Sequence, residues 1–166
     1  MKKILLLFLI SFFTKNIFAQ GYILPNEKVV FSFTTKNGKK MVLAKEKKNK
    51  YLIYRFGTSE KIELEYPKIK NKQSWDNFSF SSYMRGGGPQ NSGMELNGLH
   101  FEIDNFEYSL YQNYYAETNV NEVGLRLTNL KTMKIVDIKG KYKSLKGNLY
   151  DFRNNELVKI DKDRVD

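Results

Sequence analysis

Residues 29–44 read VVFSFTTKNGKKMVLA, two β-rich apolar runs joined by Asn37-Gly38. An Asn-Gly pair between such runs is a strong hairpin pattern, because both central residues of a type I′ turn need positive φ. Val29 to Phe33 and Met41 to Ala44 are therefore predicted to pair as antiparallel strands.

The same pattern continues on both sides of this hairpin. Lys61 to Tyr66 alternates strictly, and Pro67 ends that run because proline donates no backbone hydrogen bond. Further strands are expected over residues 51–56, 78–83, 99–103, 106–111, 123–128 and 133–138, with weaker ones at 149–152 and 157–160. Residues 68–76 are expected to form a loop. No window after the N-terminal segment sustains a helical apolar stripe. The prediction is an all-β fold, a single antiparallel meander of about 8–10 strands closed as a barrel or folded as a sandwich.

The N-terminal segment MKKILLLFLISFFTKNIFAQ has its own pattern. Lys2 and Lys3 precede an apolar run that is too short to span a bilayer as a helix, which takes about twenty residues. This is typical of a secretory signal peptide over residues 1–19, with cleavage expected after Ala19. An uncleaved N-terminal anchor is the alternative. Residues 20–166 form the expected single β-domain, in a periplasmic or secreted protein.

Composition narrows the function further. The chain has no Cys and one His, which excludes a disulfide framework, a lipoprotein and Cys- or His-rich metal sites. Lys+Arg number 28 against 18 Asp+Glu, a net charge of +10 that falls to +7 without residues 1–19. Lysine outnumbers arginine 23 to 5, which favours a bacterial source and argues against a nucleic-acid partner. A basic exported protein is expected to meet anionic envelope components or an acidic protein.

Few side chains suited to catalysis are present. Glu63 with Glu65, and Glu102 with Asp104, share a strand face and are the pairs on which a carboxylate-based hydrolase would depend. Alternation also explains them as solvent-facing residues of an antiparallel sheet. The lone His100 is expected at a surface or interface. No catalytic residue, metal or cofactor is predicted.

A glycine-rich stretch, Arg85-Gly86-Gly87-Gly88 with Asn91, is the first candidate binding surface. Consecutive glycine N–H groups can form an anion-binding nest, with the Arg85 guanidinium as a fork for carboxylate or phosphate. The structural alternative is a wide turn or bulge where another backbone passes close.

Aromatic residues form the second candidate surface. Tyr111, Tyr114 and Tyr115 crowd one stretch, and Trp75 is the single tryptophan. Exposed rings of this kind stack on sugars or anchor a protein partner, whereas aromatics are also ordinary strand and core residues. Tyr114 differs in strand parity from Tyr111 and Tyr115, so at least one face carries a tyrosine outside the core.

Three segments, YRFG at 54–57, IELEYP at 62–67 and RGGG at 85–88, occur in this order. As a set they resemble a group of uncharacterised small exported bacterial β-proteins, over roughly residues 50–140. That resemblance implies no activity. The chain is also similar in class to periplasmic lysozyme inhibitors, although it lacks the disulfide common among them.

These observations favour an exported binding protein without catalytic activity, of the class of inhibitors or immunity-type partners of a secreted enzyme. The alternatives are a glycan- or envelope-binding module that uses exposed Tyr and Trp, and the carboxylate-based hydrolase. The oligomeric state is left open.

Overall fold

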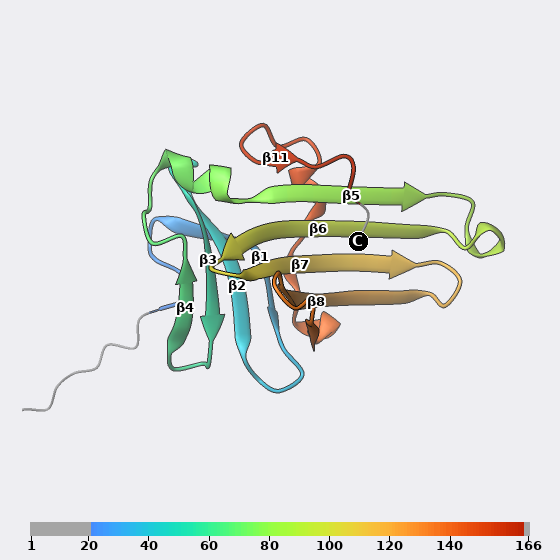
Figure 1. Cartoon of the computed structure of the whole chain (residues 1–166), viewed down its shortest axis with the longest axis horizontal. Coiled ribbons are helices and arrows are strands. Elements are labelled where there is room, and N and C mark those ends of the chain that lie inside the picture. Colours follow the sequence, from blue (N-terminus) through green and yellow to red (C-terminus); the bar gives the residue numbers. More distant parts are fainter. Residues whose placement is uncertain (1–20, 165–166) are drawn as a thin grey trace, which may run out of the picture.

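The computed structural model describes residues 21–164 and shows a sandwich of two sheets (Figure 1). The expected signal peptide lies outside the described residues. The smaller sheet has the order β10-β1-β2-β3-β4. Its strands are β1 (Glu27–Thr34), β2 (Lys40–Glu46), β3 (Leu52–Gly57), β4 (Ile62–Tyr66) and β10 (Lys146–Gly147).

The larger sheet has the order β11-β5-β6-β7-β8-β9. Its strands are β5 (Ser79–Arg85), β6 (Met94–Ile103), β7 (Phe106–Tyr115), β8 (Val120–Asn129), β9 (Ile135–Lys139) and β11 (Lys159–Ile160). All neighbours pair antiparallel except β11, which lies parallel to β5. The all-β prediction is confirmed, and of its two forms the sandwich is the one that the chain adopts. The short strands β10 and β11 depart from a plain meander, because each returns to an edge formed much earlier in the chain.

The core lies between the two sheets and is built by alternation. Phe31, Leu43 and Tyr54 occupy one cross-strand row of the smaller sheet and are fully buried. Phe101 of β6 meets this row from the other sheet, with its ring 4.8 Å from that of Tyr54. Each buried side chain of this size contributes about 1.5–3 kcal/mol, so the facing apolar rows hold the sheets together.

The Asn37-Gly38 hairpin forms, but with a different turn from the one predicted. Of the two residues only Gly38 has positive φ, at 89°. The Gly38 amide donates to Thr35 O, and the Thr35 amide donates to Lys39 O. This pattern is a three-residue loop closed by a glycine bulge, in which only the last loop residue needs the left-handed conformation.

Two segments differ from their predicted structure. The loop predicted over residues 68–76 contains most of a 3-10 helix (Lys72–Asn77), and the weak strand predicted at 149–152 is a 3-10 turn (Tyr150–Phe152). In both, a buried aromatic residue fixes the local structure: Trp75 in the first and Phe152 in the second are each 1% exposed. Two further 3-10 turns cover Pro89–Asn91 and Tyr142–Ser144.

The outer face of the smaller sheet carries a buried ion pair. Arg55 donates to both carboxylate oxygens of Glu27, at 2.6 and 2.8 Å, and to Glu65 at 2.7 Å. The side chains of Arg55 and Glu27 are fully buried. Arg55 also donates to Tyr22 O, and Tyr22 packs in a second apolar cluster with Val42. The segment before β1 therefore covers this face, which explains how a charged pair survives there.

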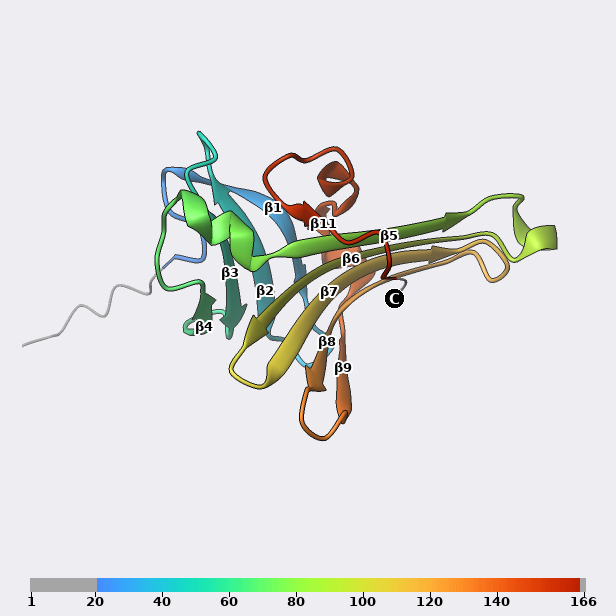
Figure 2. The same ribbon diagram turned by 45° about the horizontal axis from the view of Figure 1, so that its top comes forward.

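The larger sheet extends past the smaller one and forms an arm (Figures 1 and 2). We define the arm as residues 83–96 of β5, β6 and their connection, together with residues 113–122 of β7, β8 and theirs. Its distal end carries the loops at 86–93 and 116–119. Within residues 21–164, no helix is long and apolar enough to cross a membrane.

Candidate functional site

The arm brings together the two surfaces that the sequence suggested separately. Met94 on β6 pairs with Tyr115 on β7, and the Ala116 amide donates to Gly93 O at 2.8 Å. The glycine-rich loop and the tyrosine-rich end of β7 therefore lie side by side at the end of the arm. The sequence did not predict that these segments are neighbours, because the β6–β7 hairpin that brings them together turns far from both of them, at residues 104 and 105.

The glycine loop is ordered by its own backbone. Gly87 and Gly88 have φ of 93° and 66°, conformations that residues with a Cβ rarely adopt. A Cβ on Gly87 would also overlap the Asn91 side chain. The Asn91 and Gly93 amides both donate to Gly88 O, at 3.3 and 2.8 Å. Gly87 and Gly88 are therefore explained by the tight turn that they form. Gly86 has ordinary φ and open space around it, so the turn does not require a glycine there.

Arg85 is turned into this loop. Its Nε and Nη2 atoms donate to Ser92 O at 2.9 and 2.7 Å. This fork fixes the two ends of the loop to each other instead of reaching toward an anion. Arg85 in this position acts as a clamp that shapes the end of the arm.

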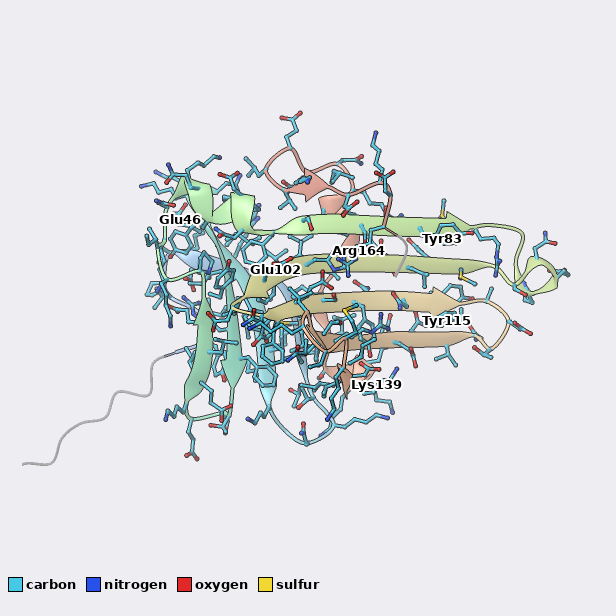
Figure 3. All side chains as sticks on the ribbon, viewed as in Figure 1. Glu46, Tyr83, Glu102, Tyr115, Lys139 and Arg164 are labelled. Atoms are coloured by element: carbon cyan, nitrogen blue, oxygen red, sulfur yellow. The ribbon has the colours of Figure 1, made fainter. Side chains whose placement is uncertain are left out.

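Apolar and aromatic side chains cover both faces of the arm. Tyr83 and Tyr115 lie on the outer face, as labelled in Figure 3, while Met84 and Tyr114 belong to the opposite face. Met84 is 71% exposed, and Tyr83, Tyr114 and Tyr115 are half-buried. Tyr83 and Met84 begin the glycine-rich stretch in the sequence, directly before Arg85, but they were not predicted as binding residues.

The two remaining aromatic candidates are not part of this surface. Trp75 is 1% exposed and donates from Nε1 to Asn49 O at 3.1 Å, so its prediction as an exposed stacking ring is wrong. Tyr111 is buried too, and it lies flat over Gly124, where a Cβ would overlap its ring. Burial raises the pKa of Tyr111, as does its hydrogen bond to Asp137. Both rings pack inside the fold, and this burial is evident only from the tertiary structure.

Charge distinguishes the arm from the rest of the chain. No lysine occurs between Lys72 and Lys131, a stretch that holds seven acidic residues and two arginines. The arm falls wholly within this stretch. Interfaces between proteins are depleted in lysine and enriched in tyrosine and methionine, which is the composition found here.

The base of the arm is braced by the segment after β10. Arg153 donates to Glu95 and, at 2.8 Å, to Asn97 Oδ1, while Gln112 accepts from the Leu149 amide at 2.8 Å. The Arg153 guanidinium lies 5.1 Å from the centre of the Tyr150 ring. The arm is therefore a rigid extension of the sandwich.

A buried polar network on the outer face of the larger sheet is a second candidate. His100 Nε2 lies 2.9 Å from Ser81 Oγ, and His100 Nδ1 lies 3.1 Å from Ser109 Oγ. Arg164 donates to both carboxylate oxygens of Glu107 at 2.7 and 2.8 Å, and this hydrogen bonding lowers the pKa of Glu107 against the opposing effect of burial. His100 was expected at a surface or interface and is 3% exposed.

The Ser81–His100 contact resembles an activated serine, but Ser81 is 2% exposed and no substrate carbonyl can approach its hydroxyl. The network instead holds residues 161–164 against the sheet, where the Asp161 amide donates to Phe80 O. An adjoining hollow of about 320 Å³ is lined by His100, Phe101 and Glu102 among others. Within residues 21–164, no group of three or more metal-ligating side chains occurs.

The carboxylate pairs lie in different surroundings. Glu63 pairs with Lys39, and Glu65 with Arg55 and Lys70. Burial by itself would raise the pKa of Glu65, but these cations outweigh it and lower that pKa below its ordinary value. A general acid needs the opposite shift, so this pair is poorly suited to that role. Glu102 and Asp104 are exposed at the end of β6.

Comparison of the chain with protein families, curated proteins and solved structures finds no match. The resemblance to small exported bacterial β-proteins stays a prediction.

Proposed function

We propose that this chain is an exported binding protein that holds a macromolecular partner with the end of its arm. The observation that carries the proposal is the arm itself: a braced four-stranded projection with Tyr83, Met84, Tyr114 and Tyr115 around a rigid glycine loop. Rigid aromatic side chains at a projecting end give large contact area at low entropic cost, and a flexible methionine beside them adapts to the shape of the partner.

The shape supports a partner with a concave surface. Substrate sites of enzymes are clefts, and a narrow projecting element fits a cleft better than a flat surface does. An inhibitor or immunity-type partner of a secreted enzyme is therefore the class that we favour. The glycan-binding alternative is less well supported, because Trp75 and Tyr111 are buried and cannot serve as exposed stacking rings.

The test is an affinity capture from the envelope and culture medium of the source organism, with residues 20–166 as bait. Wild type is compared with the Met84→Asp/Tyr114→Ala variant. The matched control is Ile69→Asp, which alters a 71% exposed side chain outside the arm. We expect one protein to be retained by wild type and control and lost with the arm variant.

Equal retention by all three baits would contradict the role of the arm. Retention of a polysaccharide in place of a protein would favour the glycan-binding alternative. Export is tested separately, by sequencing the N-terminus of the protein isolated from the medium or periplasm, where Gln20 is expected first.

A further inference from the structure

The β8–β9 hairpin carries a second surface, at the opposite end of β8 from the arm. Its turn and the adjoining start of β7 expose five large apolar side chains, which we call the apolar hairpin tip. They are Phe106 (40% exposed), Leu130 (39%), Met133 (68%), Ile135 (58%) and Val136 (50%). Figure 2 shows this hairpin extending from the sandwich in a different direction from the arm.

The apolar side chains point in several directions. Ile135 pairs with Thr128 and Val136 with Leu127, so these two neighbours lie on opposite faces of the hairpin. On the inner face, Phe106, Leu127, Val136 and Ile138 line a hollow of about 360 Å³ together with Lys134. Such a tip is a wedge, whereas a flat protein interface needs its apolar residues on one face.

Met133 adds evidence that this surface serves a purpose. Its φ is 56°, in the left-handed region where glycine and asparagine are favoured and a methionine is strained. The side chain at this position is among the most exposed of the described apolar residues. A strained, exposed methionine stabilises neither the turn nor the core, which points to a role outside the fold.

Lysines lie on the turn and at the base of the hairpin that carries the apolar hairpin tip. Lys131 and Lys134 lie on the turn, and Lys36 on the β1–β2 turn adjoins the base of the hairpin, where its amide donates to Lys139 O at 2.9 Å. Within residues 21–164, no carboxylate pairs with Lys36, Lys131 or Lys134. Asp104, on the β6–β7 turn whose Asn105 O accepts the Leu130 amide, is one acidic residue of this region, and two others, Asp137 and Glu107, are paired with Lys139 and Arg164.

We propose that the apolar hairpin tip docks on an anionic lipid surface. The apolar wedge would enter the headgroup region, and these lysines would meet the lipid phosphates, since an anionic surface attracts nearby lysines and apolar side chains gain by leaving water. The arm lies at the other end of β8 and extends from the sandwich in a different direction from the hairpin (Figure 2). This inference is independent of the partner of the arm.

The test is co-sedimentation of residues 20–166, which contain both sheets, with phosphatidylcholine vesicles with and without phosphatidylglycerol. We expect binding to the anionic vesicles alone, and weakening by added salt. Lys131→Gln/Lys134→Gln should weaken binding by roughly thirtyfold. Met133→Gly should weaken binding while the denaturation midpoint stays equal or rises, because glycine relieves the left-handed backbone.

Ile69→Asp is the matched control and should bind like wild type, because Ile69 is equally exposed but lies on the loop after β4. Binding that is equal on neutral vesicles, absent on both, or unchanged in the Met133→Gly and lysine variants would overturn the proposal. So would a dimer in sedimentation velocity that Met133→Asp/Ile135→Asp dissolves, because the tip would then join two copies of the chain.

Discussion

At the scale of single residues, the most consequential group is the Arg55 guanidinium. It is fully buried on the outer face of the smaller sheet and is satisfied by Glu27, Glu65 and the Tyr22 carbonyl. A buried ion pair adds little net stability, but removing the Glu27 carboxylate leaves Nη1 and Nη2 of the buried guanidinium without their anionic partner, and the half-buried Glu65 contacts only Nε. The chain therefore depends on Glu27 more than on any exposed carboxylate.

Glu27→Gln is expected to lower the free energy of unfolding by about 3–5 kcal/mol. The matched control is Glu63→Gln, which breaks the partly exposed pair with Lys39 and should cost about 1 kcal/mol or less. Urea denaturation followed by Trp75 fluorescence measures both, because this single tryptophan is buried and reports on the core. Equal losses in the two variants would show that Arg55 finds another partner or water.

The same group sets a pH dependence. Burial opposes ionisation of Glu27, but its hydrogen bonds and charge interaction with Arg55 prevail and lower its pKa; Glu65 behaves alike. A carboxyl group whose pKa is lower in the folded state than in the unfolded state stabilises the fold. The full stabilisation is present above the unfolded-state pKa of about 4.3 and is lost as the pH falls through the folded-state pKa. Unfolding free energy should therefore be flat near neutral pH and decline below about pH 4.3, with a shallower decline in Glu27→Gln.

At the scale of elements, the connection between β5 and β6 determines the shape of the arm. Arg85 and Gly88 tie both ends of the loop together through Ser92 O and the Gly93 amide. Because the Ala116 amide of the neighbouring connection donates to Gly93 O, order in one loop supports order in the other.

Gly87→Ala and Gly86→Ala form a matched pair on this element. Gly87 has φ of 93° and is covered by Asn91, so alanine there should destabilise the loop by about 1 kcal/mol or more. Gly86 has neither constraint, and its alanine variant should match wild type. Hydrogen exchange at the Gly93 and Ala116 amides measures the difference locally. Identical protection in both variants would refute the tight-turn role of Gly87.

At the scale of the whole molecule, β8 separates two surfaces of opposite character. One end of the larger sheet is the lysine-free arm, and the other is the apolar hairpin tip with its lysines. Lysines and exposed apolar residues are thus distributed unevenly over the molecule, which neither its net charge nor its fold class indicates.

The two surfaces are expected to act independently. Met84→Asp/Tyr114→Ala should remove partner retention and leave vesicle binding unchanged, while Met133→Gly should weaken vesicle binding and leave partner retention unchanged. Wild-type protein on anionic vesicles should still retain the partner. Sites this far apart without shared contacts are additive in free energy, so the combined variant should show both losses and no more. Partner retention that vesicles abolish would contradict the independence of the two surfaces.

The sequence by itself determined most of the strands, because alternation such as Phe101-Glu102-Ile103 marks one buried and one exposed face whatever packs against it. It also indicated the glycine loop and its neighbouring tyrosines. Tertiary structure alone decided that these two segments meet on one arm, since that depends on cross-strand register between residues far apart in the chain. It also decided that Trp75, Tyr111 and His100 are buried, because local pattern places a side chain on a face but cannot show which later segment covers that face.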